Sequence, residues 1–381
     1  MADKLEAVKA RFGALKGLGK IFLGPRDVLA VDVGAWSVKV VLLKQEGAAV
    51  ELKAWAHLPI SLKAEASPEE RKIAVVNALR GFLIEKGVKV RETATSLSGN
   101  SVIVRYVKFP RLTKTELQAT LAAEAEPFIP FDINEVQLGF HILSEIVEEG
   151  QKKMETVLVA AKKELISARL EILQAAGLQP AIMDVDSFAL ENVLERTRDP
   201  KEGTAATLCL NIGHTVTNLS VVENGVTRAV RDVFISGQTI SKAVAKAFSV
   251  EPAQADELKK RHGLLVDSAE KEKALSDGDR EALGVSQAIG QVVRDLVAEV
   301  HRSVDFYLSQ GPDRSIGRIL LSGGTARTKN LDKSLAGDLK VPVAVMDPFS
   351  FVRGAEAVPE ELRPAFGVAV GLALRRNRDW E

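Results

Sequence analysis

The chain has 381 residues, enough for two or three domains, and its 46% hydrophobic and 27% charged residues are typical of a globular protein. The 51 basic and 51 acidic residues balance, which argues against a general polyanion binder. Aromatic residues make up 5% of the chain, too few to predict a surface that stacks bases. We therefore expect no nucleic-acid partner.

The first 26 residues are predicted to form an amphipathic leader, with an apolar stripe at helical spacing beside a basic face. The stripe comprises Leu5, Val8, Phe12 and Leu15, and the basic residues are Lys4, Lys9, Arg11, Lys16 and Lys20. Such a helix either docks on its own protein or attaches weakly to an anionic membrane face or a partner. The sequence leaves both readings open.

Two stretches of the chain repeat one pattern of apolar, polar and glycine positions. They are LAVDVGAWSVKVVLL, residues 29–43, and LCLNIGHTVTNLSVV, residues 208–222. Asp32 and Gly34 of the first stretch correspond to Asn211 and Gly213 of the second. Each stretch predicts a strand, a glycine turn and another strand. The repeat indicates two related lobes whose turns face each other across a cleft.

Capping and turn residues predict several helices. Ser67 as N-cap, Pro68 at the first helical position and Gly87 as a stop bound one helix after the first strands. Residues 99–175 look like an insertion that contains a strand, a helix, the Pro-broken elbow EPFIPFDINEV, a second strand and a second helix. The later elements expected are a strand and helix around Gly237, charged helices over 251–311, a strand ending at Gly323–Gly324, a helix, a last strand and a terminal helix.

Cys209 is the single cysteine, which excludes an internal disulfide and fits a reducing compartment. It lies in an apolar run, so we expect a core side chain rather than a nucleophile. The longest apolar run, residues 366–374, is shorter than the roughly 20 residues that span a membrane. We therefore expect any membrane contact of the main body to be indirect, through partners.

Three glycine turns stand where strands end, at Gly34, at Gly213 and at Gly323–Gly324. Glycine lets backbone N–H groups approach phosphate oxygens, because no Cβ stands in the way. Side chains that add hydroxyl or amino groups near a phosphate follow the first two turns: Ser37, Lys39, Thr215 and Thr217. A lone turn of this kind fits a plain hairpin equally well, but three in register favour a phosphate site.

Other familiar site patterns are missing from the sequence. It contains no GxxxxGK[ST] motif and no GxGxxG after a strand, and its five histidines lack metal-ligand spacing. No Ser-His-Asp arrangement can be assigned.

The glycine turns, together with DVDSFAL and LLSGGTA, resemble the actin-like ATPase fold. The insertion narrows the resemblance: EAEPFIPFDINEV, VAAKKELI, GLQPAIMDVDSFAL and QADELKKRHG look like the PilM family of type IV pilus assembly. The resemblance covers residues 28–375. It implies an α/β fold of two lobes with duplicated β-sheet cores around a nucleotide cleft, plus an inserted small α+β subdomain.

The resemblance also implies a subdomain division. After the leader, 1–26, it assigns 27–98, 176–200 and the C-terminal helix 364–376 to subdomain 1A, 99–175 to the inserted subdomain 1C, 201–243 and 313–363 to subdomain 2A, and 244–312 to subdomain 2B.

The family implies ATP and Mg²⁺ as cofactors. The residues that match its nucleotide site are Asp32, Gly34, Ser37 and Lys39 in the first phosphate loop, Asn211, Gly213, Thr215 and Thr217 in the second, Asp256, Glu257 and Lys259 toward the nucleoside, and Ser322, Gly323 and Gly324 in the adenosine turn. Asp32 is the expected Mg²⁺ ligand, directly or through water, and Asp32 and Asp186 are the catalytic candidates. By composition alone, a solvated charged helix is the favoured interpretation of the segment around Asp256.

Asn211 departs from the aspartate common at this place. An amide keeps the size and a carbonyl acceptor but loses the negative charge. Phosphoryl transfer depends on metal and water held around developing charge, so we expect ATP to bind but to be hydrolysed slowly or not at all. Nucleotide would then act mainly by closing the lobes and ordering a partner surface.

The family further implies a partner. PilM proteins hold the short cytoplasmic tail of PilN, an inner-membrane protein, between the first lobe and the inserted subdomain, and they couple it to pilus motors and the platform protein in twitching motility. Phe128, Ile129 and Phe131 of the elbow are either tail contacts or packing residues of the insertion. The expected location is cytoplasmic, at the inner face of the bacterial inner membrane.

Other function classes stay open. A small-molecule kinase shares the fold, although no acidic base with adjacent sugar-binding residues can be assigned. A filament-forming division protein like FtsA is a further alternative, although that family usually ends in a membrane-binding helix and this sequence ends in GLALRRNRDWE. The cytoplasmic part of the secretion protein GspL belongs to a chain with a transmembrane helix, which we do not find in this sequence.

Overall fold

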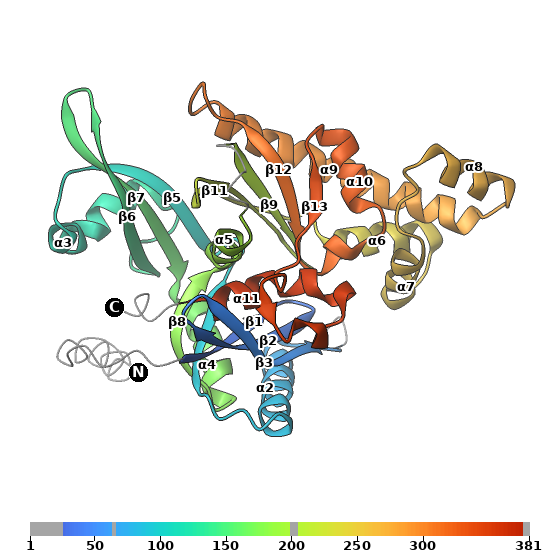
Figure 1. Ribbon diagram of the computed structural model, residues 1–381, viewed down its shortest axis with the longest axis horizontal. Helices are drawn as coiled ribbons and strands as arrows, with labels where there is room; N and C mark the ends of the chain where they lie inside the picture. The colour runs from blue at the N-terminus through green and yellow to red at the C-terminus, as the bar shows by residue number, and fades with distance from the viewer. Residues whose placement is uncertain (1–25, 63–65, 199–204, 376–381) are drawn as a thin grey trace.

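The computed structural model describes residues 26–62, 66–198 and 205–375. The predicted leader therefore lies, except for its last residue, outside the described residues. Three β-sheets organise the described chain, and helices cover or separate them (Figure 1). No helix in these ranges is long and apolar enough to cross a membrane.

The first sheet has the strand order β14-β3-β2-β1-β4-β8. Its strands are β1 (Arg26–Val33), β2 (Ser37–Glu46), β3 (Ala49–Pro59), β4 (Glu92–Leu97), β8 (Gln179–Val185) and β14 (Val352–Arg353). The strands β1, β2 and β3 form an antiparallel meander, whereas β4 and β8 add to it in parallel. Parallel strands need crossover connections, which the helices provide.

The second sheet has the order β11-β10-β9-β12-β13. Its strands are β9 (Ala206–Ile212), β10 (Thr217–Glu223), β11 (Val226–Val233), β12 (Ile316–Ser322) and β13 (Val343–Val345). The predicted repeat is confirmed at the level of register, because Asp32 pairs with Lys39 across β1 and β2 and Asn211 pairs with Asn218 across β9 and β10. The two halves are therefore copies of one strand-turn-strand unit.

Helices occupy both faces of the first sheet. The helices α2 (Pro68–Glu85) and α4 (Lys163–Ala175) pack on one face, while α5 (Asp186–Thr197) and α11 (Gly367–Ala373) fill the space between the first and second sheets. The last two helices touch closely, since a Cβ on Gly371 would come within 1.8 Å of the Ala189 carbonyl oxygen. Cys209 is buried in this inter-lobe core, as predicted, and burial raises the pKa of its thiol to about 12.

The far side of the second sheet carries a helical layer. It consists of α6 (Gly237–Phe248), α7 (Pro252–His262), α8 (Ser268–Ser276), α9 (Arg280–Leu308) and α10 (Leu331–Leu339). The long helix α9 contributes a buried apolar row from Val285 to Tyr307, which packs in the core with β9, β10 and β12. Helix α8 lies at the end of the molecule opposite the inserted sheet (Figure 1). Short 3-10 helices complete the chain: η1 (Glu126–Phe128), η2 (Gly324–Arg327), η3 (Ala355–Ala357) and η4 (Glu360–Phe366).

The inserted sheet has the order β5-β7-β6, with β5 (Val102–Pro110), β6 (Val136–Glu148) and β7 (Gln151–Lys162). Helix α3 (Lys114–Ala125) covers one face, and the predicted capping box between Thr113 and Glu116 is present, as is the N-cap at Ser67. The prediction omitted β6, a long strand that follows the elbow.

Helix α4 lies inside the range predicted for the inserted subdomain, yet its Leu173 is fully buried in the core of the first sheet. The guanidinium of Arg80 on α2 also donates to the carbonyl oxygen of Ala175 at the end of α4. This packing favours an inserted subdomain that ends near Lys162. The subdomain boundaries otherwise stay a prediction.

Candidate functional site

The first glycine turn connects β1 and β2. The Gly34 N–H donates to the Ser37 carbonyl oxygen at 3.1 Å, and the Lys39 ammonium lies 3.2 Å from the Asp32 carboxylate. Both charged side chains are largely buried, with 15% and 14% of their surface exposed. Since Ser37 is also buried, the turn presents a compact set of backbone and side-chain polar groups.

The second glycine turn copies this geometry with different chemistry. The Gly213 N–H donates to the Val216 carbonyl oxygen at 2.9 Å, at the position equivalent to the bond in the first turn. The side-chain amide of Asn211 donates to the Asn218 oxygen at 3.0 Å, where the first turn has the ion pair. The second turn thus has an amide pair and no charge at this position.

The two turns face each other. The ring of Trp36, in the first turn, and the ring of His214, in the second, have centroids 5.3 Å apart. Trp36 stays 47% exposed, so the contact lies at an open edge of the site. The matched turns therefore face each other as the repeat predicted, and a nucleotide cleft between them stays a prediction.

Arginines from two helices hold the first turn. Arg71 on α2 donates to the carbonyl oxygens of Gly34 and Ala35 at 2.8 and 2.5 Å, and Arg169 on α4 donates to that of Val33 at 3.2 Å. Sequence reasoning missed both residues, because their helices are distant in the chain and give no local signal. They add positive charge beside the turn, which suits an anionic ligand.

Asp186, the first residue of α5, lies near the same turn. Ser96 donates to its carboxylate at 2.6 Å. Burial and the nearby charge of Asp32 raise the pKa of Asp186, although Ser96 and Arg169 oppose the shift. The carboxyl groups of Asp32 and Asp186 are thus near enough for one charge to affect the other, and the catalytic role of either stays a prediction.

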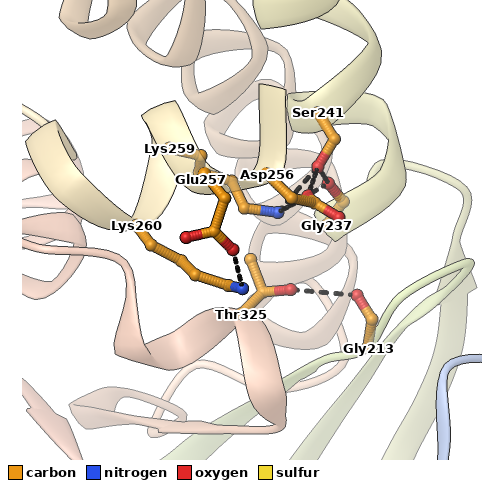
Figure 2. Close-up of polar contacts among 8 residues, drawn as sticks. All are labelled: Gly213, Gly237, Ser241, Asp256, Glu257, Lys259, Lys260 and Thr325. Carbon is orange, nitrogen blue, oxygen red and sulfur yellow. Dashed lines mark hydrogen bonds and ion pairs between the residues drawn. The ribbon is translucent and has the colours of Figure 1, made fainter. Parts of the chain in front are cut away.

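Helix α6 and the 3-10 helix η2, from the same lobe, hold the second turn. The N–H of Gly237 donates to the Gly213 carbonyl oxygen at 2.9 Å, and the Thr325 hydroxyl donates to the same oxygen at 3.1 Å. Figure 2 shows Thr325 directed at Gly213, and Lys259 directed at Gly237 and Ser241.

The predicted nucleoside segment divides into a buried pair and an exposed pair. Lys259 donates to Asp256 at 2.9 Å and to Ser241 at 2.7 Å, whereas Glu257 pairs with exposed Lys260 at 2.7 Å (Figure 2). Burial alone would raise the pKa of Asp256, but the bonds from Lys259 and Ser241 outweigh it and lower the pKa. The interpretation as a solvated charged helix describes Glu257 and Lys260, whose side chains are exposed, and the nucleotide role of Asp256, Glu257 and Lys259 stays a prediction.

The third glycine turn lies against the second. Gly323 has a φ of +88°, and a Cβ there would come within 2.5 Å of the Ile212 carbonyl oxygen and 2.8 Å of the Asn211 oxygen. Ser322 is buried and donates to the Pro364 carbonyl oxygen at 3.1 Å. Gly324 is exposed, and a Cβ there would meet nothing within 4 Å.

Two predicted phosphate contacts lie differently. Thr217 is fully buried and its hydroxyl donates to the Ile235 carbonyl oxygen at 2.6 Å, so it stabilises the turn from the protein interior. Thr215 is exposed at the turn.

The ligand roles of all the predicted site residues stay predictions. The donor set of glycine N–H groups, Lys39 and hydroxyls fits a phosphate, and Asp32 fits a hard cation. Across the described residues, no group of three or more His, Cys, Asp or Glu side chains forms a ready metal site.

A groove lies between the inserted sheet and the first lobe. Its volume is about 380 Å³, and its lining is mostly apolar. The strands β6 and β8 are terminal in their sheets as described, and both contribute to the lining. Residues from these and neighbouring elements include Gly139, His141, Val159, Ile166, Met183 and Phe188.

The elbow residues do not line this groove. Ile129 is buried in the core of the inserted subdomain, and Phe131 packs against the same core. Phe128 is 40% exposed and meets the ring of Phe109 edge-on at 6.4 Å. The role of these three residues in partner binding stays a prediction. Ile129 fits the alternative, in which the elbow packs the insertion.

A model of the type IV pilus assembly protein PilM family matches residues 30–377. The chain belongs to the PilM family. It is 28% identical to a PilM structure from a PilM-PilN type IV pilus biogenesis complex, with a TM-score of 0.77 over 92% of this chain and 98% of that one.

More distant relatives agree with the fold. The ethanolamine utilization protein EutJ from Carboxydothermus hydrogenoformans is 15% identical, with a TM-score of 0.52 over 92% of this chain and 90% of that one, and supports the fold alone. The cell division protein FtsA of Pseudomonas aeruginosa is 27% identical over 204 residues, which are 50% of this chain and 48% of that relative. The chain thus matches about half the length of this FtsA. The family match confirms the predicted family, and the structural likenesses confirm the actin-like fold.

Proposed function

We propose that this PilM-family chain is a cytoplasmic ATP-binding scaffold of type IV pilus assembly. It holds the cytoplasmic tail of a PilN-type protein at the inner face of the bacterial inner membrane and couples it to the pilus motor and platform protein. The single observation that carries the proposal is the groove between the first lobe and the inserted subdomain in a chain similar to a PilM-PilN complex.

The groove suits an extended tail. Two terminal strands, β6 and β8, border it, and a terminal strand offers backbone groups for an added strand. Apolar side chains such as Val159, Met183 and Phe188 give pockets for alternate residues of the tail. Main-chain bonds would thus supply affinity, and the pockets would supply selectivity.

The nucleotide belongs, in this proposal, to the cleft between the two glycine turns. Gly34 and Gly213 allow close backbone approach to phosphates, while Lys39 compensates charge and Asp32 holds Mg²⁺. Mg²⁺ supplies charge neutralisation to phosphate oxygens when bound. Because Asn211 pairs with another amide, the second turn lacks a carboxylate to order water, and turnover is slow or absent.

The first experiment identifies the nucleotide in the purified chain by mass and follows ATP with Mg²⁺ over hours. ATP that stays bound and nearly unhydrolysed supports the scaffold. Rapid conversion to ADP would instead indicate that Asp32 or Asp186 supplies the carboxylate that Asn211 does not.

The second experiment tests the groove. Gly139 lines it, and a Cβ there would meet nothing within 4 Å, so Gly139→Leu fills the groove without a backbone clash. A synthetic peptide with the tail sequence of the PilN-type protein from the same organism should bind Gly139→Leu at least about tenfold more weakly than wild type. Gly139→Ala is the matched control and should bind normally.

The elbow is tested in the same assay with Phe128→Ala. Lost peptide binding with nucleotide binding retained would assign the tail contact to the elbow. If both Phe128→Ala and Gly139→Leu bind the peptide with native affinity, the tail does not bind on this side of the molecule.

A filament-forming function is the second candidate, favoured by the similarity to FtsA over half of the chain. ATP-dependent sedimentation of the purified chain tests it, and a protein that stays in the supernatant at all ATP concentrations argues against it. Phosphorylation of a small metabolite by the purified chain would instead support a kinase function.

A further inference from the structure

Two aromatic rings meet at the edge of the candidate site, where the two glycine turns face each other. The rings of Trp36 and His214 have centroids 5.3 Å apart and are tilted by 41°. Trp36 stays 47% exposed, so burial in a core does not account for this large ring. The contact therefore lies at the surface, where it can open without disturbing the packed interior.

The turns themselves do not require these rings. The two stretches of the repeat match at a constant offset, so Trp36 corresponds to Thr215 and His214 corresponds to Ala35. Both turns nevertheless close with the same backbone hydrogen bond, from the glycine N–H to the carbonyl oxygen three residues later. Because a small residue at either position is compatible with the turn, the two rings are available for a contact between the turns.

Each ring stands on backbone that its own half of the molecule holds. The carbonyl oxygen of Trp36 accepts from the Ile60 N–H at 2.9 Å, beside the end of β3 in the first sheet. The carbonyl oxygen of His214 accepts from the Gln238 N–H at 2.8 Å, at the start of α6 in the second lobe. If one lobe moves relative to the other, the ring contact must therefore break or slide.

The contact brings no charge of its own to the site. Burial lowers the pKa of the His214 imidazole. The cations Lys259, Arg71 and Lys242 act in the same direction, and Asp256 opposes them. The imidazole is therefore neutral at pH 7 and meets the indole as an aromatic ring rather than as a cation.

We propose that Trp36 and His214 form a latch, a contact across the facing turns that must open each time a nucleotide enters or leaves the cleft. The inference rests on the proposed function, since the nucleotide is the ligand that passes. The latch joins two parts of the protein and does not touch the nucleotide, so it slows entry and exit by the same factor. For a scaffold with slow or absent hydrolysis, nucleotide exchange then decides how long the bound state lasts.

The test measures nucleotide exchange on the full chain by stopped-flow fluorescence. The probe is methylanthraniloyl-ADP with Mg²⁺, whose mixing with the chain gives the association rate and whose displacement by excess ADP gives the release rate. Trp36→Ala should raise both rates by about three- to tenfold, the scale of one aromatic pair, and leave the dissociation constant within about twofold of wild type. Trp36→Phe keeps a ring against His214 and should stay within about twofold of wild type in both rates.

A double-mutant cycle shows whether the two rings act as a pair. His214→Ala should raise both rates as Trp36→Ala does, and the double variant should be no faster than either single variant, because the same contact is lost. Phe306→Ala is the matched control, since it removes a 63% exposed ring on α9 and should leave both rates unchanged. Its neighbour Tyr307 donates to Glu223, at the opposite end of β10 from the turn. Thermal unfolding shows that each variant is folded.

The other outcomes overturn separate parts of the proposal. Faster release with unchanged association in Trp36→Ala would show that the indole holds the nucleotide directly and is no latch. Additive effects in the double variant would show that the rings act independently. Unchanged rates in both single variants would overturn the latch and leave the scaffold function in place. A wild-type chain that binds no ADP by calorimetry would overturn nucleotide binding, and the latch with it.

Discussion

The side-chain amide of Asn211 donates to the oxygen of Asn218 at 3.0 Å, at the exact equivalent of the Asp32–Lys39 ion pair in the first half. The duplicated units therefore differ in charge at this pair of positions. The first half has opposite charges across the hairpin, and the second half has two amides.

The direction of donation explains why an amide stands at Asn211. Asp232 can only accept, and it accepts from Gly99 and from Asn218, which turns the Asn218 oxygen toward Asn211. That oxygen requires a donor. A carboxylate at 211 would place two acceptors against each other in a buried position, where Asn211 is 9% exposed.

We predict that Asn211→Asp lowers the free energy of unfolding by about 1–3 kcal/mol, because a buried hydrogen bond is replaced by two facing acceptors. Asp232→Asn in the same chain should restore at least about 1 kcal/mol of this loss. With an amide at 232, Asn218 can turn over and donate to the new carboxylate. Urea unfolding of the two single variants and the double variant measures this coupling, and strictly additive effects would refute the proposed chain of donors.

The double variant also tests the slow turnover. Asn211→Asp with Asp232→Asn places a carboxylate at the second turn while the total charge stays the same, and ATP hydrolysis should rise by about tenfold or more. Turnover is measured under saturating ATP and Mg²⁺, beside Asp232→Asn alone as the control. Native ATP affinity with an unchanged rate would show that the carboxylate is not what hydrolysis lacks.

Gly323 and Gly324 form a natural pair of test and control. Gly323→Ala should cost about 2 kcal/mol or more, because φ is +88° and the new Cβ would meet the Ile212 carbonyl oxygen at 2.5 Å. Gly324→Ala has open space and should change stability by less than about 0.5 kcal/mol. Thermal unfolding measures both, and equal losses would contradict the close packing of the third turn.

The same pair reports on the adenosine turn. If Gly324 approaches the nucleoside with its backbone, Gly324→Ala should weaken nucleotide binding several-fold without loss of stability. Calorimetric titration with ADP checks this expectation. Native affinity would leave Gly324 outside the site.

His57, opposite Lys39 on β3, makes stability depend on pH. Burial, together with the charges of Lys39 and Arg327, lowers the pKa of His57 from 6.5 to about 4. Between these values the unfolded chain takes up a proton that the folded chain refuses, so the free energy of unfolding falls as pH falls from 6.5 toward 4. Because His57 is partly exposed and solvent screens its interactions, we expect the free energy of unfolding to fall by only about 1 kcal/mol between pH 7 and pH 5.

Urea unfolding at both pH values tests this effect. His57→Gln should lose the corresponding part of the pH dependence, and His301→Gln, at an exposed position of α9, is the matched control. If wild type and His57→Gln lose the same free energy of unfolding on acidification, the folded chain takes up a proton at His57 as readily as the unfolded chain does.

The sequence by itself determined the parts of this protein that depend on local patterns. The repeat around Asp32 and Asn211, the helix starts at Ser67 and Thr113, and the glycine turns all follow from alternation, capping and turn chemistry over a few residues. The repeat also predicted that the two turns face each other, and the contact between Trp36 and His214 agrees with this. Local hydrogen bonds and side-chain periodicity act within a segment, so the order of residues reports them.

Only the tertiary structure decided what surrounds these parts. The strand β6 is an exception, because the alternation of Val136, Leu138, Phe140 and Ile142 is visible in the sequence and the prediction missed it. Arg71 and Arg169 reach the first turn from separate helices, and the groove is lined by β6, β8, α4 and α5 rather than by the elbow at Phe128. These contacts join segments distant in the chain, and their geometry depends on how sheets and helices pack, which no local pattern of residues specifies.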